Sequence, residues 1–79
     1  MAVTAYILIQ TEVGSASGVV NQISQIEGIV SCDDVTGPYD VIAKAQAGSL
    51  DELGKIVAGN IQLIKGITRT LTCPIVNMD

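Results

Sequence analysis

Ile26-Glu27-Gly28-Ile29 and Ile64-Lys65-Gly66-Ile67 are two copies of one short pattern, and their glycines lie 38 residues apart. At the same offset, without gaps, other apolar residues also coincide: Val3 with Val41, Ala5 with Ala43, Val19 with Val57, and Ile23 with Ile61. Self-similarity at a fixed spacing indicates two equivalent structural units. The chain is therefore expected to consist of two matching halves.

The first half has the pattern of a strand, a helix and a second strand. Residues 3–11 alternate and are rich in β-branched side chains, which favours a strand. From Ala16 the apolar residues recur at helical spacing, with Ser15 or Ser17 available as N-cap and Gly28 as the C-terminal stop. Residues 29–36 again favour a strand.

The second half repeats this order. Gly37-Pro38 marks a turn before a strand over residues 40–47. Ser49 and Glu52 have the spacing of a capping box, and a helical stripe follows them. Its members are Leu50, Leu53, Ile56, Val57, Ile61 and Ile64. Gly66 is expected to end this helix before a strand over residues 67–75, in which Pro74 suits only an end or an edge.

Two right-handed strand–helix–strand units interleaved in one sheet give an α+β, ferredoxin-like βαββαβ sandwich. The expected strand order is 4-1-3-2, with both helices on one face. That order places Cys32 and Cys73 on opposite edges, too far apart for a disulfide. The other face, which carries either Tyr6 and Leu8 or the alternate residues Ala5, Ile7 and Ile9, would be bare in a single chain.

Composition points to self-association and excludes several functions. A chain of 79 residues forms one domain, and 48% hydrophobic residues without Trp or Phe leave much apolar surface on a small core. The net charge of −4 argues against a nucleic-acid or anionic-membrane surface. The absence of His removes His-dependent acid–base chemistry and most metal sites. With no apolar run long enough to cross a membrane and no basic export segment, the chain is expected to be cytoplasmic.

The stretch Val35-Thr36-Gly37-Pro38-Tyr39-Asp40-Val41 is the most informative for binding. A turn at Gly37 and Pro38 exposes backbone N–H groups that can take an α-carboxylate, while Asp40, helped by Asp34, can take an α-ammonium. The alternative is a plain hairpin loop in which Asp40 accepts N–H groups of the turn. The adjacent Asp33 and Asp34 point to opposite faces of a strand, which argues against a metal site at this pair.

Across essentially its whole length the chain resembles the effector-binding domain of the Lrp/AsnC regulators, the domain for regulation of amino-acid metabolism. Four segments carry the resemblance: Ala5 to Ile9, Ile26 to Val30, Val35 to Ile42 with the signature Thr-Gly-x-aromatic-Asp, and Ile64 to Thr72. The resemblance implies a dimeric αβ-barrel type of assembly, built through sheet faces and often extended to tetramers or octamers. It also implies that an amino acid or related small molecule binds between subunits.

The matching positions for effector binding are Asp34, Thr36, Gly37, Pro38, Tyr39, Asp40, Thr70, Thr72 and Cys73. We expect no catalytic residues, metal or cofactor. Residues 1–79 are interpreted as a single effector-binding domain without a helix-turn-helix domain, so direct DNA binding is not expected. A role in transcription would then act through co-assembly with full-length Lrp/AsnC regulators.

Two other functions remain open. One is a small dimeric αβ-barrel enzyme that uses the cavity between the sheets, which would need Tyr6 and Lys44 to point into a mostly apolar cavity. The other is a purely structural assembly module.

Overall fold

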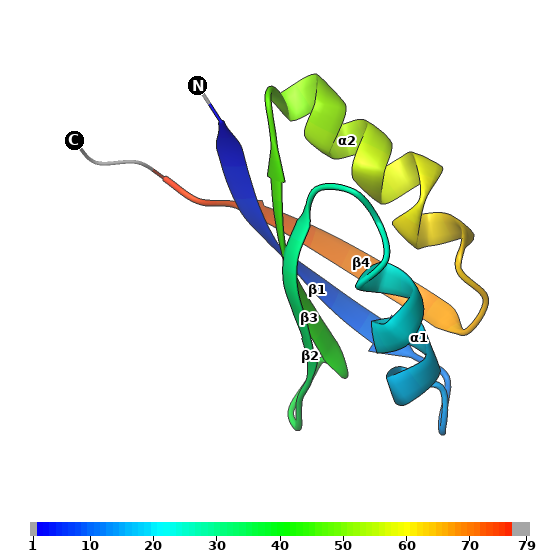
Figure 1. Ribbon diagram of the computed structural model, residues 1–79. Coiled ribbons are helices and arrows are strands. Elements are labelled where there is room, and N and C mark those ends of the chain that lie inside the picture. Colours follow the sequence, from blue (N-terminus) through cyan, green and yellow to red (C-terminus); the bar gives the residue numbers. More distant parts are fainter. Residues whose placement is uncertain (1, 77–79) are drawn as a thin grey trace.

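The computed structural model describes residues 2–76 and shows the doubled order of elements (Figure 1). The elements are β1 (Val3–Thr11), α1 (Ala16–Ile23), β2 (Ile29–Asp34), β3 (Val41–Ala47), α2 (Leu50–Gly59), a 3₁₀ turn η1 (Ile61–Leu63) and β4 (Ile67–Pro74). The βαββαβ order of the ferredoxin-like fold is confirmed.

The four strands form one antiparallel sheet in the order β2-β3-β1-β4, which is the predicted order read from the other edge. The two outer strands carry Cys32 and Cys73, and both thiols are free. Pro74 is the last residue of the edge strand β4, where its missing N–H costs no ladder hydrogen bond.

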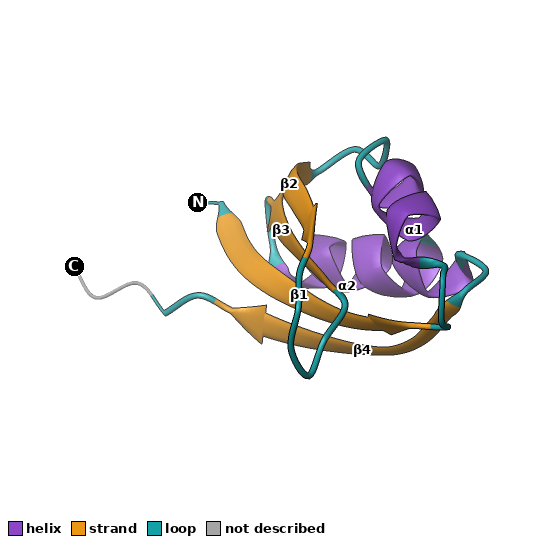
Figure 2. Cartoon of the chain, turned by 90° about the horizontal axis from the view of Figure 1, so that it is seen from below, coloured by secondary structure: helices purple, strands orange, loops and turns teal. Residues whose placement is uncertain are grey.

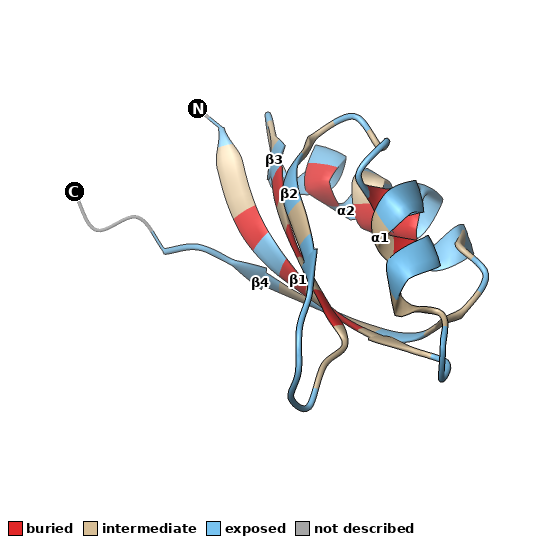
Figure 3. Cartoon of the chain, turned by 60° about the horizontal axis from the view of Figure 1, so that its bottom comes forward, coloured by how far each residue is buried: buried red, intermediate tan, exposed pale blue. Residues whose placement is uncertain are grey.

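Both helices lie on one side of the sheet (Figure 2). The residues of β1 that face the helices are Ala5, Ile7 and Ile9, because all three are fully buried. The core fills the space between sheet and helices (Figure 3), and its other members are Val19, Ile23, Val41, Ala43, Ala45, Leu53, Val57 and Ile61. Alternation along the strands therefore sends the neighbours of these residues to the opposite side.

That opposite side, called here the uncovered face, carries Tyr6, Leu8, Ile42 and Leu71 at its centre. Leu8 pairs with Ile42 on one side and with Leu71 on the other. Tyr6 is 43% exposed and Leu71 is 42% exposed. Large apolar side chains side by side in water are typical of a surface that another protein covers.

Several predicted element ends were wrong. Helix α1 ends at Ile23, five residues before Gly28, where the backbone bonds change to turns of the i−3 type, Gln25 N–H to Gln22 O and Ile26 N–H to Ile23 O. Strand β2 ends at Asp34 and β3 begins at Val41, so each is shorter than expected.

The second helix also differs from the prediction. It ends at Gly59 and is followed by η1, and Leu50 of the predicted apolar stripe is 62% exposed. The capping pair is present, since the Glu52 N–H donates to Ser49 Oγ at 3.1 Å. The Glu52 carboxylate reaches back to the Gly48 N–H at 3.0 Å rather than to that of Ser49.

The two glycines of the sequence repeat have the same structural role. Gly28 and Gly66 have φ angles of 99° and 101°, in the left-handed region that favours glycine. A Cβ at Gly28 would lie 2.7 Å from Ile56 Cδ1, and one at Gly66 would lie 3.1 Å from Ser15 Cβ. The repeat therefore marks two places where the chain turns into a strand directly under a helix.

Candidate functional site

The loop between β2 and β3, residues 35–40, is fixed to the end of β1. The Asp40 N–H donates to the Ile9 carbonyl at 2.9 Å, and Asp40 Oδ2 accepts the Thr11 N–H at 2.8 Å. The Gln10 side-chain amide donates to the Pro38 carbonyl at 3.0 Å. The loop is thus held by the neighbouring strand through both backbone and side-chain contacts.

On the uncovered face this loop walls a hollow of about 560 Å³. Its floor is Leu8 of β1 and Ile42 of β3, and its wall is the loop residues Val35, Thr36, Gly37, Pro38 and Tyr39. Four of the predicted site residues, Thr36 to Tyr39, line this space, called here the apolar hollow. Its size and apolar lining are typical of pockets for small molecules.

A second hollow, of about 330 Å³, lies on the helix side of the same loop and is called here the acidic hollow. It is lined by Ala16, Asp34, Val35, Thr36 and Asp40. Strand alternation accounts for the separation of the two acids of β2, since Asp33 pairs with Ile42 and Asp34 pairs with Val41. The structure therefore brings Asp34 and Asp40 together, as the sequence predicted.

The predicted site residues of β4 do not join this group within one chain. Thr70 and Thr72 pair with Ile9 and Ile7, so both lie on the helix side, whereas Cys73 pairs with Tyr6 on the uncovered face. Thr70 Oγ1 accepts a hydrogen bond from Gln62 at 3.2 Å, beside a third hollow of about 330 Å³ at the free edge of β4. Strand β1 separates all three from the loop in the order of the sheet.

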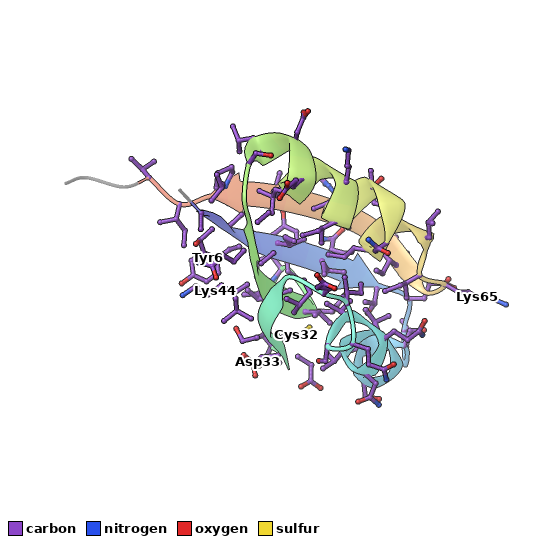
Figure 4. The ribbon with its side chains drawn as sticks, turned by 45° about the horizontal axis from the view of Figure 1, so that its top comes forward. Tyr6, Cys32, Asp33, Lys44 and Lys65 are labelled. Carbon is purple, nitrogen blue, oxygen red and sulfur yellow. The ribbon has the colours of Figure 1, made fainter. Side chains whose placement is uncertain are left out.

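Two cationic side chains lie on the uncovered face. The Lys44 ammonium lies 6.0 Å from the centre of the Tyr6 ring, and Figure 4 shows the two side chains together. Arg69 pairs with Gln10 and is exposed. Neither Tyr6 nor Lys44 lines the apolar hollow, but both lie on the face that would border a cavity between two sheets.

Cys32 is half-buried on the helix side of β2, where it pairs with Ala43. Burial, and then the negative charges of Asp33 and Asp34, raise the pKa of the Cys32 thiol to about 11, against a smaller lowering by a hydrogen bond with Ser24. The Cys32 thiol is therefore expected to stay protonated at neutral pH.

Comparison with known proteins identifies the family of the whole chain. The family model described as the Lrp/AsnC ligand binding domain matches residues 4–78.

The chain belongs to the Lrp/AsnC family.

An uncharacterised HTH-type transcriptional regulator of Pyrococcus furiosus is 33% identical to this Lrp/AsnC chain over 75 residues, which cover 91% of this chain and 50% of the regulator. The chain thus spans about half the length of the curated Pyrococcus relatives that it matches. The resemblance stated from sequence motifs alone is confirmed.

Solved structures agree on the fold. A protein from Thermus thermophilus superposes with a TM-score of 0.92 at 26% identity, covering 98% of this chain and 96% of that one. A transcriptional regulator from Neisseria meningitidis, solved as a complex with L-methionine, superposes with a TM-score of 0.84 at 14% identity, covering 95% of this chain and 50% of that one.

Sequence reasoning missed part of this Lrp/AsnC domain's candidate site. Leu8 and Ile42 line the apolar hollow, and Gln10 and Thr11 hold its wall, yet none of the four was singled out for binding. Strand alternation was the available signal, because it puts Leu8, Gln10 and Ile42 on one face once the register is known.

Within residues 2–76, no helix is both long and apolar enough to cross a bilayer. The same residues contain no cluster of three or more His, Cys, Asp or Glu side chains suited to a metal ion.

Proposed function

We propose that this chain is a non-enzymatic effector-binding and oligomerisation module, which takes an amino acid or a related small molecule at the junction between copies of the chain. Membership of the Lrp/AsnC ligand-binding domain family supports a regulatory role. The observation that carries the proposal is the apolar hollow, because the loop bearing the family signature walls it on the face that a single chain leaves bare.

The oligomeric part of the proposal rests on the uncovered face. Leaving an apolar side chain such as Leu or Ile in water forfeits about 1.5–3 kcal/mol, a large share of the stability of a small domain. Tyr6 and Leu71 are each more than two-fifths exposed, and Leu8 and Ile42 lie between them and the loop. A second copy packed face to face would cover these side chains and close the open side of the hollow, giving a dimer that can assemble to a tetramer or octamer.

The regulatory part of the proposal is indirect. We propose that the module changes transcription of genes for amino-acid metabolism by co-assembly with full-length Lrp/AsnC regulators in the cytoplasm, not by contacting DNA. The net charge of −4 supports this, since nucleic-acid surfaces are basic. The L-methionine in the complex of the Neisseria relative supports an amino acid as the class of effector.

Thermal unfolding in the presence of each of the twenty amino acids tests the binding step. A ligand at 100 times its Kd adds about 2.7 kcal/mol, and each kcal/mol raises the Tm of a domain of this size by roughly 4–8 °C. Val35→Asn, which alters the lining of both hollows, should abolish the shift. Val30→Asn, an equal change at a 58% exposed residue outside them, should retain it. No shift with any amino acid would contradict the proposal.

A further inference from the structure

We infer that each effector site is shared between two copies of the chain. The acidic hollow of one copy and the hollow at the free edge of β4 of the other copy meet, and together they bind the two charged ends of one α-amino acid. The inference rests on the proposed function and narrows its ligand to molecules that carry both an α-ammonium and an α-carboxylate. A single chain then holds two half-sites, and a dimer holds two complete sites.

The hollow at the free edge of β4, called here the edge hollow, is suited to an anion. Its volume is about 330 Å³, and among the described residues that line it Arg69 alone carries a charge. Thr70 Oγ1 accepts a hydrogen bond from the Gln62 amide at 3.2 Å, so the hydrogen of this hydroxyl is free for a ligand. A guanidinium beside a hydroxyl donor is a suitable partner for a carboxylate.

The acidic hollow is suited to the opposite charge. The charged groups among its described lining residues are the carboxylates of Asp34 and Asp40. The Thr11 N–H and hydroxyl bond to Oδ2 of Asp40, at 2.8 Å and 3.4 Å, so its Oδ1 can accept a hydrogen bond from a ligand. Two carboxylates in one hollow can take an ammonium through charge-assisted hydrogen bonds.

The two hollows lie at one level of the sheet, but at opposite edges. Asp34 on β2 pairs with Val41, and Val41 pairs with Ile9. Ile9 in turn pairs with Thr70 on β4, so one row across the sheet joins the two hollows. Three strand spacings of about 4.8 Å each separate them within one chain. One small amino acid cannot reach both, so a single chain cannot bind both ends of it.

The backbone of both outer strands lacks a partner on its open side. The Ile75 N–H donates to the opposite Thr4 carbonyl at 2.8 Å, and hydrogen-bonded pairs alternate along an antiparallel ladder. Thr70 and Thr72 therefore direct their backbone N–H and C=O groups away from β1, to the free edge. Strand β2 is the other outer strand and is open on the side away from β3. Such edges pair readily with another strand.

One arrangement of two copies covers the uncovered face and pairs both edges. Each neighbouring pair in the order β2-β3-β1-β4 is antiparallel, so β2 and β4 run in opposite directions. A two-fold axis parallel to the strands puts β4 of each copy beside β2 of the other, antiparallel, and closes the sheet. An axis across the strands would put β4 over β4 and leave every edge open. The charges agree with the first axis, because β2 ends in Asp33 and Asp34 and β4 carries Arg69.

This axis brings the two half-sites together. Rotation about it leaves the level of each residue unchanged, so Thr70 of one copy reaches the level of Asp34 of the other. Tilt of the strands in a closed sheet slides β4 along the seam by a few residues, which keeps Thr70 beside the stretch formed by β2 and the loop. Val35 and Thr36 line both the acidic and the apolar hollow, so the side chain of the bound amino acid can turn into the apolar one.

Cross-linking tests the seam without any ligand. Thr36→Cys and Thr70→Cys chains, both carrying Cys73→Ser, are unfolded together, refolded and treated with a short bis-maleimide. The mixture should give a covalent dimer, whereas each chain alone should not. Lys55→Cys, at an exposed residue of α2, replaces Thr70→Cys as the control and should not cross-link to Thr36→Cys. A yield no higher than that of the control would overturn the inference and leave the proposed function standing.

Matched ligands test whether both charged ends are bound. Calorimetric titration uses the amino acid with the largest Tm shift among the twenty, its amide, which lacks the carboxylate, and its 2-oxo acid, which lacks the ammonium. We expect the amide and the 2-oxo acid each to bind at least about tenfold more weakly, as for loss of a hydrogen bond to a charged group. Either analogue binding as well as the amino acid would overturn the inference.

Mixed dimers test whether the two ends are bound by different copies. Arg69→Gln and Asp34→Asn should each weaken binding by about tenfold or more, whereas Lys44→Gln, which removes a cation outside both half-sites, should change it by less than about threefold. Arg69→Gln and Asp34→Asn chains refolded together in equal amounts should recover about a quarter of the sites at full affinity, because half the dimers are mixed and each mixed dimer has one intact site. No recovery would show that both groups act within one chain and would overturn the inference. If no amino acid shifts the Tm, the inference and the proposed function fail together.

Discussion

The Asp40 carboxylate accepts the backbone N–H of Thr11 at 2.8 Å and so joins the signature loop to the end of the neighbouring strand β1. The acid of the family signature therefore has a structural contact in the chain by itself. Because Thr11 is the last residue of β1, the contact gives the terminal N–H of this strand a hydrogen-bond partner.

Asp40→Ala is expected to lower the free energy of unfolding by about 1–3 kcal/mol, since it leaves a part-buried N–H without its partner. Asp33→Ala removes an exposed carboxylate from the adjoining strand β2 and should change stability by less than about 0.5 kcal/mol. Urea denaturation at one fixed protein concentration measures both. Equal effects would show that the contact with Thr11 contributes nothing.

The repeat glycine Gly28 is expected to resist substitution. Gly28→Ala forces a residue with a Cβ to a φ of 99° and against Ile56 and the Gln46 carbonyl, so it should cost more than about 1 kcal/mol. Gly54→Ala lies inside α2 with no atom within 4 Å of the new Cβ, and should stabilise by roughly 0.5–1 kcal/mol. We expect the denaturant midpoint to fall in Gly28→Ala and to rise in Gly54→Ala. An unchanged midpoint in Gly28→Ala would contradict the prediction for Gly28.

Substitutions at two exposed leucines test whether the uncovered face, and not another part of the surface, holds the complex together. Leu71→Asp puts a charge where a second copy is proposed to pack, so the complex should dissociate. Leu63→Asp makes the same change on η1, at a side chain that is 76% exposed, and should leave the mass unchanged. Light scattering after gel filtration measures the masses. Retention of the complex by Leu71→Asp would place the interface elsewhere.

The two thiols are expected to differ in reactivity. Cys73 is exposed, whereas burial and two neighbouring carboxylates raise the pKa of Cys32 to about 11, so almost no Cys32 thiolate exists at pH 8. Titration with a thiol reagent at pH 8, in the Leu71→Asp variant that is expected not to assemble, should label Cys73 rapidly and Cys32 only on unfolding. Cys73→Ser should abolish the fast phase, and a fast phase that survives would contradict this assignment.

The same pKa shift makes stability fall at high pH. The unfolded Cys32 ionises near its ordinary value of 9.0 and the folded one near 11, so the unfolded chain binds fewer protons between these values. Its contribution is complete below pH 9 and is lost as the pH rises through 11. Cys32→Ala should flatten this part of the profile, measured by urea denaturation from pH 8 to 11. An unchanged slope would count against the shift.

The fold was predictable because its signals are local and repeated. The glycine repeat and strand alternation were enough for the element order and the strand order. The sequence alone did not decide which side of β1 faces the helices. Both alternating sets are apolar, one being Ala5, Ile7 and Ile9 and the other Tyr6 and Leu8. The predicted end of α1 was wrong because the apolar spacing continues to Ile26, whereas the backbone changes to i−3 turns after Ile23.

The candidate site was harder to predict because it depends on pairing between distant strands. The signature loop was found from its own residues, but its contacts with Gln10 and Thr11 span 28 and 29 residues of sequence. Thr70, Thr72 and Cys73 were assigned to the site from the family resemblance, whereas the register of the sheet places Thr70 and Thr72 on the helix side and Cys73 on the uncovered face. Whether a second copy brings Cys73 to the loop remains a prediction.

Sedimentation equilibrium of the unmodified chain at micromolar concentrations tests the central claim most directly, namely that the uncovered face is a surface between copies. The account predicts a mass at least twice the 8.2 kDa of one chain, with a folded circular dichroism spectrum. A folded species of 8.2 kDa across the whole concentration range would contradict it.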